Sequence, residues 1–260
     1  MTPAETVEHN LIEFFRQFAA TQPFGRLAQR DGVQVAAAAA RFMMFNAAFF
    51  STPVTAEDDL GRRLELLWGL MGDLRPGWAL WASDDKLRGV SSWAGEIFKR
   101  HELYPAFRHP GLACEELAPP SRHLPKVEFR PVDDCASRRE FARLNSHAFH
   151  LPPEWCLELY DKESLWVDRF SGFLAYAGNR PVSCAATLVA AETIGVYAVA
   201  TLPGHERRGY GEAVTRHAVE CAQSRWGLKR SILQATQAGL PLYLRMGYRV
   251  VTAFTVYCTR

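Results

Sequence analysis

The stretch that most constrains this chain runs from Val196 to Ala222, where an apolar, strand-like run leads through a basic, glycine-rich turn into an amphipathic helix. The run stops at Thr201-Leu202-Pro203, and Gly209 and Gly211 lie in the turn. Because glycine lacks Cβ, it adopts positive φ at little cost and lets a ligand approach the backbone. Main-chain N–H groups around Arg207–Gly211, with the positive end of the helix dipole, favour a phosphate or pyrophosphate. The stretch predicts an α/β fold with an anion-binding turn.

Two common nucleotide-binding motifs do not fit this turn. A P-loop requires Lys and then Ser or Thr at its end, whereas Gly211 is followed by Glu212 and Ala213. A dinucleotide-binding loop requires a third glycine where Val214 stands. On these residues alone, an ordinary strand-to-helix connection remains an alternative to a binding site.

The downstream sequence extends the pattern. Ser231–Thr236 predicts a short strand, Leu240–Met246 a helix ended by Gly247, and Tyr248–Tyr257 a further strand. This order resembles the GNAT superfamily of acyl-CoA-dependent N-acyltransferases. The resemblance covers the chain from about Lys126 onward.

Two sequence blocks carry the resemblance. The pyrophosphate loop of the family, Arg/Gln-x-x-Gly-x-Gly/Ala, is matched by Glu206–Gly211, and its helix ending Leu-Tyr-x-x-x-Gly-Phe/Tyr is matched by Leu242–Tyr248. The family implies a mixed, mostly antiparallel sheet flanked by helices and transfer of an acetyl group from acetyl-CoA directly to a primary amine. It also implies main-chain binding of the cosubstrate by Val199, Ala200, Thr201, Arg207, Arg208, Gly209, Tyr210, Gly211 and Glu212.

Tyr243 matches the family tyrosine that lies by the CoA sulfur and protonates the leaving thiolate, a general-acid role. Its alternative is a core tyrosine. Glu206 departs from the family, because Arg or Gln usually holds its place and a carboxylate repels pyrophosphate. Arg207 and Arg208 can offset that charge, so we expect Glu206 to point outward. A non-catalytic acyl-CoA-binding sensor or scaffold protein is the alternative function.

The general base is not fixed by one sequence. Glu192, at the start of the central strand, is the first candidate. His147, His150 and Glu154 are further candidates, because they lie in the helical segment that usually walls the acceptor side in this family. Four aromatic residues either line an acceptor pocket or belong to the core: Trp155, Tyr160, Trp166 and Tyr197.

The proline-rich stretch Ala118–Pro125 predicts a linker between two domains, residues 1–120 and 121–260. The N-terminal half echoes the C-terminal order, since Ala48–Pro53 parallels Ala198–Pro203. The acids Glu57, Asp58 and Asp59 stand where phosphate needs donors. We therefore expect a degenerate GNAT-like half that does not bind CoA and serves as a structural partner or walls the acceptor pocket.

Composition limits the remaining possibilities. The formal net charge of +2 and the absence of basic runs make nucleic acid a poor partner. Arg41 and Asn46 interrupt the longest apolar run, so no membrane segment is expected. The acidic-polar N-terminus lacks the features of a signal peptide, which predicts a cytoplasmic enzyme. The histidines have no zinc spacing, so no metal is expected. We expect a small-molecule amine acceptor and a monomer or homodimer.

Overall fold

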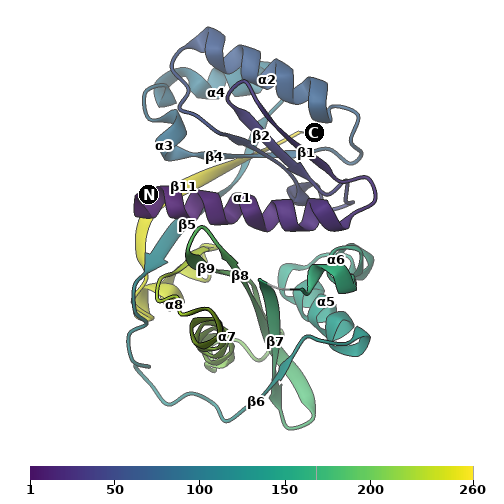
Figure 1. Cartoon of the computed structure of the whole chain (residues 1–260), viewed down its shortest axis with the longest axis vertical. Helices are drawn as coiled ribbons and strands as arrows, with labels where there is room; N and C mark the ends of the chain where they lie inside the picture. Colours follow the sequence, from purple (N-terminus) through teal and green to yellow (C-terminus); the bar gives the residue numbers. More distant parts are fainter. Residues whose placement is uncertain (168, 260) are drawn as a thin grey trace. The chain divides into compact units, whose positions relative to one another are not determined.

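The computed structural model of the chain describes residues 1–167 and 169–259 (Figure 1). The chain divides into two compact units. The first unit comprises Met1–Asn10 and Leu112–Val250, and the second comprises Leu11–Gly111 and Val251–Arg260. Each unit takes a short segment from the far end of the chain. The division therefore differs from the predicted boundary between residues 120 and 121, which assumes two continuous halves.

The first unit contains six strands in the order β5-β10-β9-β8-β7-β6. The pairs β6–β7, β7–β8 and β8–β9 are antiparallel, and β9–β10 is parallel. The strands are β5 (Tyr104–Cys114, in this unit from Leu112), β6 (Glu128–Pro131), β7 (Phe170–Ala177), β8 (Arg180–Ala190), β9 (Thr193–Thr201) and β10 (Ser231–Gln234). The helices are α5 (Cys135–Phe149), α6 (Pro153–Tyr160), the short η2 (Glu163–Leu165), α7 (Tyr210–Trp226) and α8 (Leu240–Arg245).

Helices cover both faces of this sheet: α5 and α6 lie on one side of β7 and β8, and α7 lies on the other (Figure 1). Val214 and Ala218 of α7 are buried against Ala175 and Ala185, whose small side chains let the helix approach the strands closely. On the opposite face, the Phe141 ring lies edge-on to Tyr160 and Trp166. The sheet is therefore buried on both faces.

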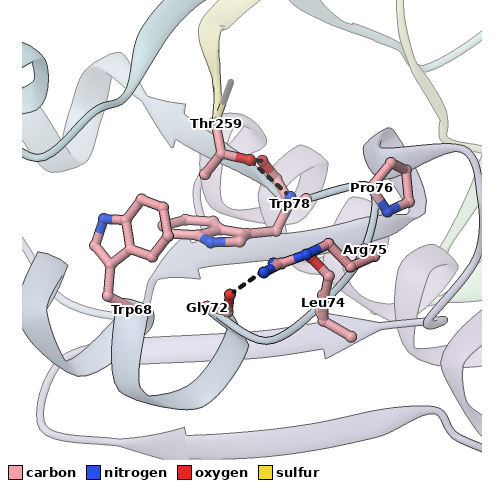
Figure 2. A pocket seen from close by; sticks show the side chains of 8 residues that line it. Trp68, Gly72, Leu74, Arg75, Pro76, Trp78 and Thr259 are labelled. Carbon is pink, nitrogen blue, oxygen red and sulfur yellow. Dashed lines mark hydrogen bonds between the residues drawn. The ribbon is translucent and has the colours of Figure 1, made fainter.

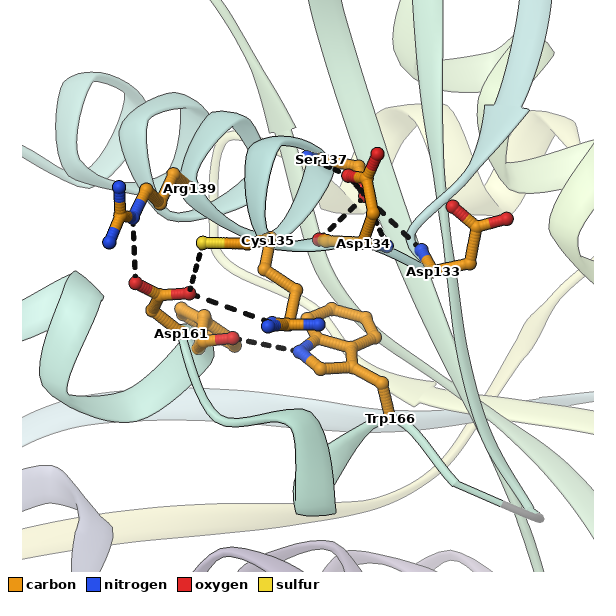
Figure 3. Close-up of polar contacts among 9 residues, drawn as sticks. Asp133, Asp134, Cys135, Ser137, Arg139, Asp161 and Trp166 are labelled. Carbon is orange, nitrogen blue, oxygen red and sulfur yellow. Dashed lines mark hydrogen bonds and ion pairs between the residues drawn. The ribbon is translucent and has the colours of Figure 1, made fainter.

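A polar cluster joins α5 to the end of α6 (Figure 3). Asp134 caps α5 by accepting a hydrogen bond from the Ser137 N–H at 2.6 Å. Asp161, directly after α6, pairs with Arg139 at 2.9 Å and with Arg138 at 3.5 Å. These contacts fix the angle between the two helices.

The second unit contains five strands in the order β1-β2-β3-β4-β11. The pair β3–β4 is parallel, and β1–β2, β2–β3 and β4–β11 are antiparallel. The strands are β1 (Arg26–Arg30), β2 (Val33–Ala37), β3 (Asn46–Phe50), β4 (Ala79–Ser83) and β11 (Arg249–Cys258, in this unit from Val251). The helices are α1 (Pro3–Thr21, in this unit from Leu11), η1 (Met43–Phe45), α2 (Glu57–Met71), α3 (Asp84–Leu87) and α4 (Ser91–Arg100).

Alternation along β3 gives the second unit a core on each face of its sheet. Phe50 is buried in a cluster with Leu60 and Leu64 of α2, whereas Phe49 contacts Phe15 of α1. At the C-terminal end of α2, Trp68 packs edge-on against Trp78 beside an open cavity of about 310 Å³ (Figure 2).

The predicted fold class, a mixed and mostly antiparallel sheet flanked by helices, is confirmed. The predicted strand Ser231–Thr236 corresponds to β10 (Ser231–Gln234), the predicted helix Leu240–Met246 to α8 (Leu240–Arg245), and the predicted strand Tyr248–Tyr257 to β11 (Arg249–Cys258). Helix α1 and the β1–β2 hairpin were not predicted from the sequence.

Candidate functional site

Strands β9 and β10 separate part-way along their length. β10 pairs with β9 only as far as Leu233↔Val196, whereas β9 continues to Thr201. The other edge of β9 stays paired with β8 up to Thr201. Among the described residues, the edge of residues 198–201 that faces away from β8 has no strand partner. Its main-chain groups are therefore available to a ligand.

A β-bulge lies at this gap. Ala198 and Val199 together oppose Ala185 of β8, and Ala198 has φ +50°. For a residue with a Cβ this conformation costs about 1 kcal/mol. The Ser183 hydroxyl donates to the Ala200 carbonyl at 2.7 Å and so fixes the strand beyond the bulge. Because a bulge bends a strand, the main chain changes direction where the acyl-binding residues were predicted.

The turn between β9 and α7 carries free main-chain donors. Arg207 and Gly209 have φ of +59° and +92°, and the first bond of the helix runs from the Ala213 N–H to the Gly209 carbonyl at 2.9 Å. Within the described part of the chain, none of the N–H groups of Arg207–Glu212 has an acceptor. We call these N–H groups the turn donors. At a helix N-terminus such donors suit an anion.

Glu206 makes its hydrogen bonds upstream of the turn donors. Its exposed carboxylate accepts the Gly204 N–H at 2.7 Å. Hydrogen bonds from its own N–H and from that of Gly204 lower the pKa of the Glu206 carboxyl, so it is ionised at neutral pH. Arg207 and Arg208 are exposed beside it. The local charge is therefore cationic despite Glu206.

Glu212 can serve a ligand only through its main chain. Its side chain is buried and pairs with Arg216 one turn later, at 2.8 Å. The carboxylate is thus neutralised inside the unit, as a buried charge requires. The main-chain N–H of Glu212 is still a turn donor.

Gly211 is the point at which the predicted elements meet. A Cβ placed on Gly211 would lie 3.3 Å from Thr201 Oγ1 and 3.9 Å from Leu242 Cδ2. The turn donors, the end of β9 and the helix that carries Tyr243 therefore converge. The structure brings these predicted residues together from three separate elements.

Tyr243 is buried with a free hydroxyl. It packs with Val196 and lies edge-on to Tyr248 at 5.9 Å. Burial raises the pKa of Tyr243, so its hydroxyl stays protonated well above neutral pH. This hydroxyl has no hydrogen-bond partner in the described ranges, whereas that of Tyr248 bonds Ser231 Oγ at 2.8 Å. Tyr243 therefore has a proton available for donation.

The structure does not bring Glu192 to this point. Glu192 is exposed in the turn between β8 and β9, with φ +54°. At about 3.3 Å per residue, an extended strand places it about 20 Å from Ala198. Direct proton transfer by Glu192 at the strand gap is therefore not supported.

The other acceptor-side candidates lie on the helices or in the core. His147 and Glu154 are exposed on α5 and α6, and His150 is exposed at the C-terminus of α5. Trp155 lies half-buried on α6. Two of the aromatics pack in the core, Tyr160 and Trp166 against Phe141. Tyr197 is also buried and bonds Asn10.

The turn between β3 and α2 in the second unit holds an internal cation. The Arg63 guanidinium donates to the carbonyls of Thr52 at 2.7 Å, Pro53 at 3.0 Å and Gly32 at 3.2 Å. It also pairs with Asp59 at 2.9 Å. Burial raises the pKa of Asp59, but hydrogen bonds from Arg63 and the Thr55 N–H lower it overall. A phosphate site directs N–H donors at an anion, whereas this turn directs carbonyl acceptors at a cation.

Neither a metal cluster nor a membrane helix is found in residues 1–167 and 169–259. No three His, Cys, Asp or Glu side chains gather there as metal ligands. None of the helices in those ranges combines the length and apolarity needed to cross a bilayer.

Residues 168–250 match the family model of the acetyltransferase (GNAT) domain. This chain carries a GNAT domain. The matched segment contains the strand gap, the turn donors and Tyr243, so the family match and the geometry point to the same part of the first unit. No curated protein matches the sequence.

Solved structures share the fold at low identity. A GCN5-related N-acetyltransferase from Kribbella flavida is similar with a TM-score of 0.72 and 16% identity, covering 99% of this chain and 95% of its own. A functionally unknown conserved protein from Staphylococcus epidermidis gives 0.62 and 12%, covering 89% and 92%. A GCN5-related N-acetyltransferase from Sphaerobacter thermophilus gives 0.60 and 16%, covering 88% and 76%. At these identities the likeness shows the GNAT fold alone.

One group of residues beside the turn was not predicted from the sequence to lie there. Arg122, Leu124 and Pro125, predicted as linker, contact the turn at Gly209. Their proline-rich composition indicated an extended segment, but it gave no sign of where that segment docks.

Proposed function

We propose that the first unit is an N-acyltransferase that moves an acetyl group from acetyl-CoA directly to a primary amine, without a covalent enzyme intermediate. The observation that carries the proposal is the convergence at Gly211 of the turn donors, the end of β9 and the helix of Tyr243. The GNAT domain supports an acyl-CoA ligand. Within the class of acyl-CoA-dependent transferases, we propose acetyl as the acyl group and a small-molecule amine as the acceptor.

The residues of the turn fit the phosphates of acetyl-CoA. A pyrophosphate is held by several N–H groups directed at one place, and the turn donors have no competing acceptor in the part of the chain that is described. Gly209 allows the positive φ of the turn and leaves room for Pro125, and Gly211 leaves room for Thr201, so the turn can close without side chains of its own at these positions. Arg207 and Arg208 add positive charge. Val199–Thr201, at the open edge of β9, would hold the pantetheine arm.

When bound, acetyl-CoA supplies an acyl group activated as a thioester. The main-chain N–H groups at the open edge of β9 would polarise the acyl carbonyl, a preorganised contribution of the kind that acyl transfer requires. Tyr243 would donate its hydroxyl proton to the departing sulfur. The attacking amine loses one proton during transfer, and Tyr243 regains one from solvent before the next turnover.

We further propose that the second unit, which contains most of residues 1–120, is a degenerate GNAT-like domain that does not bind CoA. The Arg63 guanidinium supports this assignment, because it bonds the carbonyls of Thr52 and Pro53 where a binding turn would direct N–H groups. In the proposal, acceptor chemistry and acyl-CoA binding therefore belong to one site per chain.

Tyr243→Phe tests the mechanism. We expect kcat to fall at least ~10²-fold, because a general acid is worth about 10² to 10⁴, with the Kd for acetyl-CoA changed less than about threefold. Turnover of a panel of polyamines, amino acids, aminoglycosides and peptide N-termini supplies the assay. Tyr248→Phe is the matched control, since it removes another buried hydroxyl of the same cluster and should leave kcat intact.

The same experiments address the alternative of an acyl-CoA-binding sensor, which Glu206 in the usual Arg/Gln position favours. Calorimetric binding of acetyl-CoA with no turnover of any amine would support the sensor. Absence of binding would contradict both functions. Unchanged kcat in Tyr243→Phe would contradict the role of Tyr243.

A further inference from the structure

The segment Ala118–Pro125, which we call the strap, is docked at both ends within the first unit. At its start, the Ala118 N–H donates to the Met246 carbonyl at 2.9 Å, at the C-terminal end of α8. At its end, Pro125 Cδ lies 3.0 Å from a Cβ placed on Gly209. A proline-rich segment with two such anchors is part of the unit rather than a free linker.

The strap runs from the helix of Tyr243 to the turn donors. Between Ala118 and Arg122 the chain can span at most about 14 Å, because an extended residue covers about 3.5 Å. The end of α8 and the turn are therefore neighbours across the strap. Residues Pro120–Leu124 border an open hollow of about 560 Å³.

Arg122 places a third guanidinium at the turn. Its Nη1 donates to the Arg207 carbonyl at 3.1 Å, and its Nη2 lies 3.7 Å from a Cβ placed on Gly209. The side chain is exposed. A guanidinium carries five N–H donors in a planar fork, so the bond to Arg207 leaves donors for an anion. With Arg207 and Arg208, Arg122 makes this side of the turn strongly cationic.

We propose that the strap forms the outer wall of the acyl-CoA site and that Arg122 binds the 3′-phosphate of coenzyme A. This inference rests on the proposed function. The turn donors account for the pyrophosphate, whereas a phosphate monoester carries a charge near −2 at pH 7 and needs cationic donors of its own. Arg122 is the strap residue that reaches the turn with such donors.

The test is calorimetric titration of the full-length chain with CoA and with 3′-dephospho-CoA. Wild type should bind CoA more tightly, and Arg122→Ala should weaken CoA binding about tenfold while changing the Kd for dephospho-CoA less than twofold. Arg122→Lys should recover part of the loss. Arg180→Ala removes another exposed arginine, in the β7–β8 hairpin, and should change neither Kd.

Each other outcome is decisive. An equal loss for both ligands in Arg122→Ala would mean that Arg122 only shapes the turn through the Arg207 carbonyl, and unchanged binding of both would mean that it contacts neither ligand. Either result overturns the 3′-phosphate site while leaving the proposed function intact. If wild type binds neither ligand, the proposed function fails and this inference fails with it.

Discussion

Arg63→Met should strongly lower the free energy of unfolding of the second unit. The guanidinium side chain is only 8% exposed and the paired Asp59 side chain 15% exposed. Without Arg63, the carbonyls of Thr52, Pro53 and Gly32 and the Asp59 carboxylate lose a shared donor. Removing one partner of a buried ion pair costs about 3–5 kcal/mol.

Thermal unfolding followed by circular dichroism measures this loss. For a domain of about 100 residues, 1 kcal/mol shifts Tm by about 4–8 °C, so the transition of the second unit should fall by about 12 °C or more. Asp59→Asn added to Arg63→Met should recover part of the stability, because the uncompensated carboxylate is then gone.

Arg62→Met is the matched control. Arg62 precedes Arg63 on the same helix and also reaches Asp59, at 3.4 Å, but its side chain is 75% exposed. An exposed pair of this kind contributes about 0–1 kcal/mol. If Arg63→Met costs no more than Arg62→Met, the Arg63 guanidinium does not organise the turn, and the proposal that it takes the place of a bound phosphate there is wrong.

Three further predictions concern the first unit. Gly209→Ala should weaken acetyl-CoA binding measured by calorimetry, because Gly209 has φ +92° and a Cβ would lie 3.0 Å from Pro125 Cδ. Gly204→Ala is the control and should not weaken binding, because Gly204 also has positive φ, +81°, but has open space where a Cβ would lie. Burial lowers the pKa of His217. The stability that neutral His217 contributes is therefore present above its unfolded pKa of about 6.5 and is lost as pH falls through the lower folded pKa. Between pH 7 and pH 5, the urea midpoint should therefore fall less in His217→Phe than in the wild-type protein. Asn10→Ala should lower the free energy of unfolding by about 2–4 kcal/mol, because the Ala190 carbonyl and the Tyr197 hydroxyl lose a buried hydrogen-bond partner. His9 is exposed, so His9→Ala should lower it by under about 0.5 kcal/mol in the same denaturation assay.

The parts of the site that were predictable are encoded locally. Gly209, Gly211 and Tyr243 were identified because a turn and a short helix depend on residues a few positions apart. The main-chain conformation agrees, since Gly209 has positive φ and Tyr243 lies within α8. Their convergence at Gly211 followed from the family resemblance rather than from spacing.

The parts that were missed depend on distant partners. Arg122 bonds a residue 85 positions later, and Asn10 bonds Tyr197, 187 positions later. Neither contact alters the local pattern of hydrophobic residues, so periodicity carries no trace of it. Glu192 shows a different limit: the sequence places a carboxylate next to the central strand, but only the structure shows that its turn lies at the far end of β9 from the strand gap, and its role as base stays a prediction.

The division of the chain has a consequence for its biosynthesis. Strand β4 is made well before its antiparallel partner, Phe254–Cys258 in β11, because residues 84–253 lie between them in the sequence. Until then, one edge of β4 lacks the strand that covers it in the native state, and such an edge can pair with another chain. The second unit is thus interrupted by residues 112–250 of the first unit, so a ribosome that stalls before residue 254 leaves this sheet edge open to aggregation.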